Sequence, residues 1–323
     1  MKKIISLILL FCAGISYGET ARDNRGKWGY IHHKANLDAG YIESIIDSYE
    51  VIAITGFTIA GPRKISHDAN ALYRTVLSAA QKHGTMLYPL ISFSSPAAGH
   101  NILENGNSRK ELADTIVSFA GERGWSGVHL DFEYLPPGDA LALSMLLKEL
   151  KRRSQGLKLT MAVFPQAGFP EKYAGFHDPA LLSPHVDEIV LMAYDLHRPG
   201  TAPGPVTNLA WAEKNILALL AYYGNDRIWL GVPAYGYSWH GKSAEAVSAK
   251  YGEVLAGKFG SRRDASGCLH IRYNAGNKSR EAYISDRYMR SQMSGLAARY
   301  RLRGTALWRL GFEEEESGGA KKY

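Results

Sequence analysis

The segment SGVHLDFEY, residues 126–134, alternates apolar and polar side chains as a β-strand does. Successive side chains of a strand point to opposite faces. One face of this strand is apolar: Val128, Leu130 and Phe132. The opposite face carries three ionisable groups: His129, Asp131 and Glu133. Burying three such groups is costly unless they serve a function, so this strand is the first place to look for chemistry.

Seven other segments have the composition of buried strands, and with the first they make eight. Most are near-continuous apolar runs, as expected for parallel strands buried on both faces. The eight runs occupy residues 27–33, 51–60, 85–93, 126–133, 157–165, 186–195, 227–236 and 304–311. Four stretches between them have helical patterns with start and stop residues: 71–83, 109–122, 140–154 and 209–223.

Strand followed by helix, repeated over about 280 residues, predicts an α/β fold of the (β/α)8 TIM-barrel type. An open, doubly wound sheet is the structural alternative. The glycine-rich turns of this chain lack the spacing of a dinucleotide-binding loop, which favours the barrel.

The two chain ends and one long interval lie outside this alternation of strands and helices. Residues 1–18 combine two lysines with a short apolar run, the pattern of a secretory signal peptide. Residues 19–323 then form a single domain. We expect residues 238–284, after the seventh strand, to be a small insertion of weak internal structure. We expect residues 313–323 to be a flexible, solvated tail.

The composition limits the classes of partner and the cellular location that we expect for this protein. The formal net charge of +7 is modest for 323 residues, and no Lys- or Arg-rich stripe of the nucleic-acid-binding kind occurs. The apolar run of the signal is too short to cross a bilayer, so we expect no membrane span. Cys268 is the single cysteine after the signal, which excludes an internal disulfide. These features predict a secreted or periplasmic protein, and we expect a monomer.

The carboxyl groups of Asp131 and Glu133 lie one strand period apart. Repulsion between them favours a proton on one of the two, which suits a general acid. Glu133 comes shortly before Pro136 and Pro137, at the C-terminal end of its strand, where barrel enzymes carry their active sites. Two alternatives are a polar network that only fills the barrel, and a metal site made of His129 and the two carboxylates.

Four segments together resemble glycoside hydrolase family 18. GVHLDFEYLPP at residues 127–137 resembles the strand-four signature of the family, Asp-x-x-Asp-x-Asp-x-Glu. It is most similar to the branch of bacterial spore-cortex and cell-wall N-acetylglucosaminidases. The other three segments follow in the family's order: LMAYDLH at 191–197, GVPAYGYSW at 231–239 and GTALWRLG at 304–311. The resemblance covers nearly the whole chain after the signal.

The resemblance implies a role for each matching residue. Glu133 is the general acid that protonates the glycosidic oxygen and later activates water. Asp131 orients the 2-acetamido group of the substrate, and Tyr194 hydrogen-bonds the carbonyl of that group. The other motif residues contact the bound sugar: Met192, Asp195 and Trp308. The implied mechanism is retention assisted by the acetamido oxygen of the substrate, with no metal and no cofactor.

This sequence departs from the family signature at two positions of the strand. Ser126 and His129 stand where the family has aspartates, so we expect His129 to tune Asp131 and to line the sugar site. Aromatic rings can stack on sugar faces, and Trp239 and Tyr235, near the end of the seventh strand, are further candidates for sugar contact.

The resemblance implies an N-acetylated polysaccharide as partner, with peptidoglycan favoured, and cleavage of β-1,4 bonds of GlcNAc. A chitinase or an endo-N-acetylglucosaminidase acting on other glycans is one alternative, and a non-catalytic, chitinase-like lectin is another. The insertion at 238–284 holds eight Lys or Arg against four Asp or Glu. We therefore hypothesise that it overhangs the sugar groove and attracts an anionic glycan.

Overall fold

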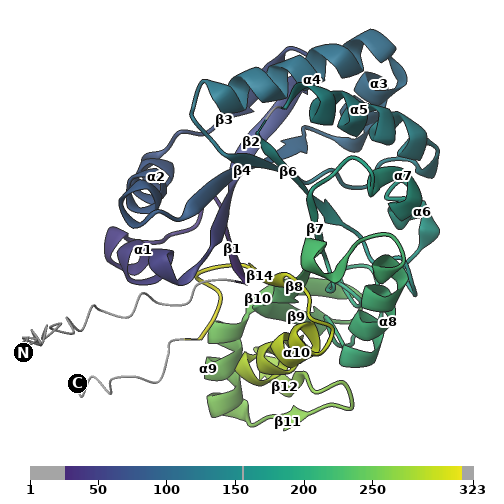
Figure 1. Ribbon diagram of the computed structural model, residues 1–323. Helices are drawn as coiled ribbons and strands as arrows, with labels where there is room; N and C mark the ends of the chain where they lie inside the picture. Colours follow the sequence, from purple (N-terminus) through teal and green to yellow (C-terminus); the bar gives the residue numbers. More distant parts are fainter. Residues whose placement is uncertain (1–25, 155, 315–323) are drawn as a thin grey trace, which may run out of the picture.

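The computed structural model describes residues 26–154 and 156–314, and eight parallel strands form a closed ring at its centre (Figure 1). The ring runs in the order β1-β14-β8-β7-β6-β5-β4-β2 and closes through pairing of β1 with β2. Its strands are β1 Lys27–Ile31, β2 Val51–Gly61, β4 Met86–Phe93, β5 Gly127–Leu130, β6 Lys158–Val163, β7 Glu188–Leu191, β8 Ile228–Pro233 and β14 Gly304–Trp308. Each overlaps one of the eight predicted runs, so the predicted TIM barrel is confirmed.

Helices surround the ring on its outer side (Figure 1). The α-helices outside the insertion are α1 Ala39–Ile45, α2 Ala71–His83, α3 Pro96–Glu104, α4 Gly106–Gly121, α5 Ala140–Arg153, α6 Glu171–Ala174, α7 Pro179–Leu182, α8 Leu209–Leu220 and α10 Arg287–Arg299. Three 3-10 turns are η1 Ile46–Ser48, η2 Pro137–Asp139 and η3 Asn225–Arg227. Helix α2 has the predicted bounds because the Asn70 side chain caps its first turn and Gly84 ends it in the left-handed conformation.

The alternation of β5 divides its side chains between two cores. Val128, Leu130 and Phe132 are fully buried between the strands and the outer helices. The inside of the ring is filled by a separate cluster: Trp28, Tyr30, Val51, Ala53, Tyr88, Leu90, Val190, Trp229 and Ala306. The barrel is therefore a packed core with room for a site only at its C-terminal mouth.

An ion pair between the buried Glu188 and the partly exposed Lys158 lies at the N-terminal end of the barrel interior. Glu188, which is 6% exposed, accepts hydrogen bonds from Lys158 Nζ at 2.6 Å and from Trp229 Nε1 at 2.8 Å. The Trp229 ring in turn packs against Trp28, with ring centroids 5.4 Å apart. These contacts hold the interior aromatic layer beneath the mouth in one arrangement.

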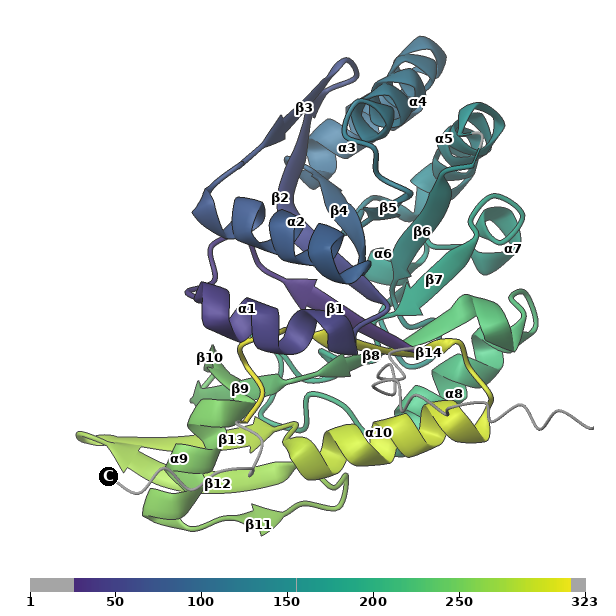
Figure 2. The same cartoon turned by 60° about the vertical axis from the view of Figure 1, so that its left-hand side comes forward.

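The segment predicted as a weakly structured insertion is an ordered α+β unit, so that prediction is wrong (Figure 2). Its elements are β9 Tyr235–His240, β10 Ser243–Ser248, α9 Ala249–Phe259, β11 Arg262–Arg263, β12 Leu269–Ala275 and β13 Lys278–Ile284. The strands form an antiparallel sheet in the order β10-β9-β13-β12-β11. One face of this sheet is exposed, so its strands are polar in composition and resemble a loop in the sequence.

Two residues of the predicted tail, Glu313 and Glu314, are held by the folded domain. Glu314, which was assigned to the solvated tail, is 7% exposed. Its carboxylate pairs with Arg290 and accepts from the backbone N–H of Arg287 at 2.9 Å. Tyr41 donates a hydrogen bond to Glu313. Residues 315–323 and the predicted signal peptide at 1–18 lie outside the described residues.

A short hairpin extends β2 beyond the barrel. Strand β3, Lys64–His67, pairs antiparallel with the end of β2 and lies against α4. Within the described ranges, no helix combines the length and the apolar character needed to cross a membrane.

We predict that Gly127→Ala destabilises the barrel. A Cβ at residue 127 would lie 2.5 Å from ring atoms of the buried Tyr88, too close for any real contact. Overpacking of this kind costs about 1–3 kcal/mol of unfolding free energy. Urea denaturation followed by circular dichroism measures this loss.

The matched control is Gly257→Ala in α9, where a Cβ meets no atom within 4 Å. We expect this variant to unfold at the same or a slightly higher urea concentration. Equal stability of the two variants would contradict the account of the interior packing.

Candidate active site

The inward face of β5 opens into a cavity of about 130 Å³ at the C-terminal mouth of the barrel. The lining residues come from all parts of the ring: Tyr30, Leu90, His129, Asp131, Glu133, Ala162, Met192, Tyr194, Asp195, Tyr235 and Trp308. Eight of the nine residues predicted for the site lie in this set. Strand alternation and parallel pairing bring them together, because all eight strands point their C-terminal ends at one face.

Asp131 and Glu133 form a hydrogen-bonded carboxyl pair in the cavity. Burial raises the pKa of Asp131 to about 6, although its hydrogen bond with Glu133 acts in the opposite direction. Burial, with the charge of Asp131 as the next cause, raises the pKa of Glu133 well above its usual range. Glu133 therefore keeps its proton at neutral pH and donates it to the ionised Asp131.

Asp131 keeps one carboxylate oxygen free for another partner. Its Oδ1 atom is buried and has no hydrogen-bond partner among the described residues. An unsatisfied buried carboxylate oxygen costs free energy unless a ligand donates to it. This oxygen belongs to a residue that lines the cavity, which makes it an acceptor for an N–H group bound there.

His129 lies at the base of the cavity and is fully buried. Its Nδ1 lies 2.9 Å from the hydroxyl of Thr160, and that hydroxyl donates to the carbonyl oxygen of Val128. Nδ1 must therefore carry the hydrogen, and Nε2 accepts from the Tyr30 hydroxyl at 2.9 Å. Burial lowers the pKa of His129 to about 3, so the ring is neutral.

The expectation that His129 tunes Asp131 is wrong. Both ring nitrogens of His129 are used by Tyr30 and Thr160. Burial raises the pKa of Asp131 and the hydrogen bond with Glu133 lowers it, with no contribution from the neutral ring of His129. His129 supports Tyr30 from below, and the two carboxyl groups set their own protonation.

Asp195 is held by two tyrosines of β9. The hydroxyls of Tyr235 and Tyr237 both donate to Asp195 Oδ1, at 2.5 and 2.9 Å. The backbone of Asp195 has a left-handed φ of 61°, which an aspartate tolerates at a cost. The adjacent Tyr194 lines the cavity, and in the described chain its hydroxyl makes no hydrogen bond. Tyr194 thus has a donor available for a ligand.

Trp308 lies across the ring from Glu133 and forms one wall of the cavity. Its ring meets Tyr30 edge-on, with centroids 5.2 Å apart. Tyr30 and Tyr237 are site residues that were not among those predicted. The alternation of β1 places Tyr30 on the same inward face as Trp28, and this signal could have found it. Tyr237 follows the predicted Tyr235 by two residues in GVPAYGYSW, so strand alternation could have found it as well.

Trp239 does not belong to this cavity, and the prediction that it contacts sugar is wrong. The side chain is 1% exposed and lies in the sheet of the insertion. Its ring packs between Tyr237 and Tyr283, with centroids 5.7 and 6.1 Å away. A ring covered on both sides has no face left for a sugar.

The metal alternative does not fit the geometry. Neither nitrogen of His129 is free to bind a cation. In residues 26–154 and 156–314, no three or more His, Cys, Asp and Glu side chains are arranged to hold a metal ion.

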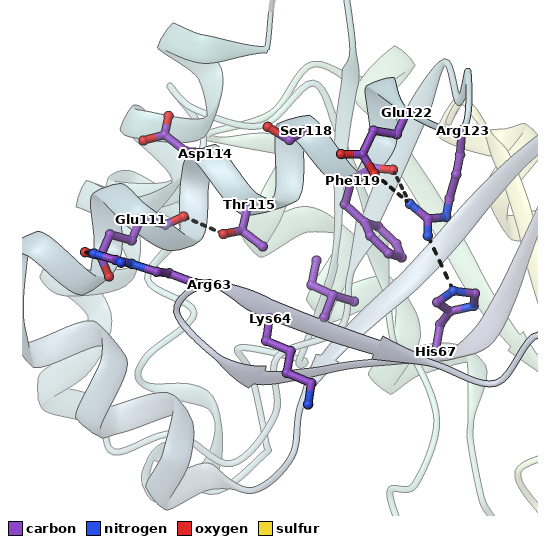
Figure 3. Close-up of a pocket in the computed structure, with 11 residues that line it drawn as sticks. Arg63, Lys64, His67, Glu111, Asp114, Thr115, Ser118, Phe119, Glu122 and Arg123 are labelled. Carbon is purple, nitrogen blue, oxygen red and sulfur yellow. Dashed lines mark hydrogen bonds and ion pairs between the residues drawn. The ribbon is translucent and has the colours of Figure 1, made fainter.

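A larger groove of about 770 Å³ lies outside the barrel, between the β2–β3 hairpin and α4 (Figure 3). Two of its arginines are paired within the protein, Arg63 with Glu111 and Arg123 with Glu122. The guanidinium of Arg123 also stacks 3.8 Å from the Phe119 ring centroid. None of the predicted site residues lines this groove, so the smaller cavity is the candidate active site.

The sequence profile described as Glycosyl hydrolases family 18 matches residues 32–313, most of the chain. The chain belongs to glycosyl hydrolase family 18. It is therefore a glycoside hydrolase, as its four motifs indicated. Proteins of family 18 act on polysaccharides that contain GlcNAc, and the site described above lies within the matched residues.

Three known proteins illustrate how far the similarity of this family 18 hydrolase extends. The cortical fragment-lytic enzyme of Bacillus subtilis (strain 168) is 27% identical over 231 residues, 67% of this chain and 54% of that enzyme. A chitinase from Chromobacterium violaceum ATCC 12472 superposes with a TM-score of 0.82 at 22% identity, over 90% of this chain and 96% of the other. The spore cortex-lytic enzyme SleL of Bacillus megaterium QM B1551 superposes with a TM-score of 0.79 at 21% identity, over 92% of this chain and 73% of the other. The two solved structures share the barrel fold.

We predict that Tyr30→Phe destabilises the hydrolase by about 1–3 kcal/mol, because it leaves His129 Nε2 buried without a donor. Equilibrium unfolding in urea measures the loss. The control is Tyr88→Phe in the same interior cluster, whose hydroxyl reaches only the Met86 sulfur at 3.5 Å. A thioether is a weak acceptor, so we expect a smaller loss there. Equal losses would contradict the hydrogen-bond network assigned to His129.

Proposed function

We propose that this hydrolase cleaves β-1,4 N-acetylglucosaminide bonds of peptidoglycan with retention of configuration. The observation that carries the proposal is the Asp131–Glu133 pair, in which one group holds a proton and the other has a free, buried oxygen. A lectin needs no such proton donor. The raised pKa of Glu133 instead suits a general acid at neutral pH.

The first step follows from the positions of three polar groups. Glu133 gives its proton to the glycosidic oxygen, and the bond between that oxygen and the anomeric carbon breaks. The acetamido oxygen of the retained sugar attacks the anomeric carbon from the opposite side and forms a cyclic intermediate. Asp131 Oδ1 accepts the acetamido N–H, and the Tyr194 hydroxyl donates to the acetamido oxygen. Both contacts hold the acetamido oxygen in line with the glycosidic bond that breaks.

In the second step Glu133 acts as a base instead of an acid. The ionised Glu133 takes a proton from water, and the water oxygen attacks the anomeric carbon. The acetamido ring opens, and the product keeps the original configuration. Trp308 supports the retained sugar, Met192 fills the cavity wall, and Asp195 shapes the same subsite with Tyr235. The mechanism uses no metal or cofactor.

Two observations support peptidoglycan as the polymer. The bacterial spore-cortex and cell-wall branch carries the closest motif resemblance, and a relative named as a cortical fragment-lytic enzyme is 27% identical. The similarity to a solved chitinase makes chitin the second candidate. We propose a secreted or periplasmic location, because residues 1–18 have the pattern of a signal peptide.

We predict that Glu133→Gln lowers kcat/KM on peptidoglycan by roughly 10²- to 10⁴-fold, because glutamine has the shape of glutamate but cannot deliver the proton. Mass spectrometry of the released fragments measures the activity and identifies the new reducing ends. The wild-type enzyme should leave GlcNAc there. Glu253→Gln in α9 is the control, since its side chain is exposed and away from the cavity.

N-acetylmuramic acid at the new reducing ends would show that the enzyme is a muramidase and would contradict the proposed specificity. Release from chitin oligosaccharides alone would make the enzyme a chitinase. An unchanged rate in Glu133→Gln would overturn the assignment of the acid.

The pH profile provides a separate prediction about the carboxyl pair. Activity needs Asp131 ionised and Glu133 protonated, so kcat/KM should rise through the Asp131 pKa of about 6 and fall at alkaline pH as Glu133 loses its proton. Asp131→Asn removes the charge that raises the Glu133 pKa. The alkaline limb of the residual activity should therefore move to lower pH.

Initial rates measured from about pH 4 to about pH 10 resolve both limbs of the profile. Asp226→Asn, an exposed position in η3 at the opposite end of the barrel, serves as the control and should leave both limbs in place. An alkaline limb that stays fixed in Asp131→Asn would show that the two groups do not share a proton.

A further inference from the structure

A cluster of aromatic and basic side chains lies beside the acid, above the ends of β5, β6 and β7. We call it the Arg198 rim, and it consists of Tyr134, Phe169, Tyr173 and Arg198. The ring of Tyr134 meets that of Tyr173 edge-on, with centroids 5.7 Å apart. Tyr134 directly follows Glu133, and its side chain is 44% exposed. The rim is thus an accessible surface continuous with the catalytic cavity.

Arg198 is held in a defined position within this rim. Its guanidinium carbon lies 4.7 Å from the Phe169 ring centroid and 5.4 Å from that of Tyr173. One terminal nitrogen donates to the backbone carbonyl of Asp195 at 2.9 Å. Stacking on aromatic rings fixes the plane of a guanidinium and leaves its other N–H groups free at the edge.

The positive charge of Arg198 is not neutralised by the protein. In the described part of the chain, no carboxylate forms an ion pair with it. The charge still acts on the site, because Arg198 lowers the pKa of Asp195 and of Tyr134 against the larger raising effect of burial. Three arginines of the basic insertion differ in this respect, since each pairs with a carboxylate: Arg263 with Asp286, Arg272 with Glu281, Arg280 with Glu245.

The rim lies where the leaving part of the substrate must be. The acid touches the oxygen that joins the retained sugar to the leaving sugar. Trp308, which supports the retained sugar in the proposed function, is on β14, four strands from β5 in the ring of eight and thus on the opposite wall. The leaving sugar therefore lies on the Glu133 side of the mouth, next to Tyr134 and Arg198.

We propose that Arg198 is a specificity residue that binds a carboxylate carried by the leaving sugar. This inference rests on the proposed function, since it needs the glycan to run across the mouth from Trp308 to Glu133. In peptidoglycan the sugar that follows GlcNAc bears a lactyl ether, whose carboxyl group is a free carboxylate where no stem peptide is attached, whereas in chitin it has a neutral hydroxyl. The free edge of a guanidinium matches a carboxylate with two parallel hydrogen bonds. The rim thus favours an anionic glycan over a neutral one.

The test compares two forms of one substrate. Peptidoglycan oligosaccharides with free muramyl carboxylates are compared with the same oligosaccharides after conversion of those carboxylates to methyl amides. For Arg198→Gln, the ratio of kcat/KM on the first form to kcat/KM on the second should fall by roughly 10- to 100-fold. Arg198→Lys keeps the charge without the forked geometry, and its ratio should fall less.

Lys172→Gln is the matched control. It removes one positive charge whose nitrogen lies 4.7 Å from the ring centroid of the same Tyr173, but on the exposed side of α6. We expect the ratio to remain as in the wild type. Equal losses on both substrate forms in Arg198→Gln would overturn the proposal, since they would show a general role through the Asp195 carbonyl.

A binding measurement separates this inference from the proposed function. Calorimetry in the Glu133→Gln background measures the affinity for both oligosaccharide forms with and without Arg198→Gln. A selective loss of affinity for the carboxylate form supports the role of Arg198, and an equal loss contradicts it. Absence of cleavage of either form by the wild-type enzyme would overturn the proposed function, and the calorimetry would still decide the role of Arg198.

Discussion

In the proposed mechanism, the chemistry of this hydrolase depends on one proton held between Asp131 and Glu133. Two carboxyl groups this close cannot both be ionised in a poorly solvated site, so one stays protonated. Burial is the largest cause of the raised pKa of each group. The barrel provides that burial, because the aromatic layer around Trp28 and Trp229 fills its interior and leaves space only at the mouth.

A neutral histidine takes the place of an acidic group beneath this pair. His129 bridges Thr160 of one strand and Tyr30 of another, and its low pKa keeps the ring uncharged. A further carboxylate at this depth would compete for the shared proton and would need its own partner. With a neutral ring there, the protonation of Asp131 and Glu133 depends on burial and on each other, and the charge of Asp195 also raises the pKa of Glu133.

Two loops bring the remaining groups over the mouth with unusual backbone conformations. Tyr134 and Asp195 have φ values of 58° and 61°, in the left-handed region that side chains other than glycine seldom adopt. Such conformations cost of order 1–3 kcal/mol and persist where the surrounding structure holds them. Two tyrosines of β9 hold Asp195, so the strand that leads into the insertion helps to build the candidate active site.

The sequence by itself determined the barrel and most of the cavity, because strand alternation and the common direction of parallel strands are local patterns. Strand alternation placed Asp131 and Glu133 at the mouth, and the family resemblance added Trp308. Only the tertiary structure decided which groups are covered and which share hydrogen bonds. Trp239 is enclosed by a sheet whose polar strands resemble a loop, and Tyr30 reaches His129 across 99 residues. Burial and proton positions depend on such long-range contacts, which no short motif records.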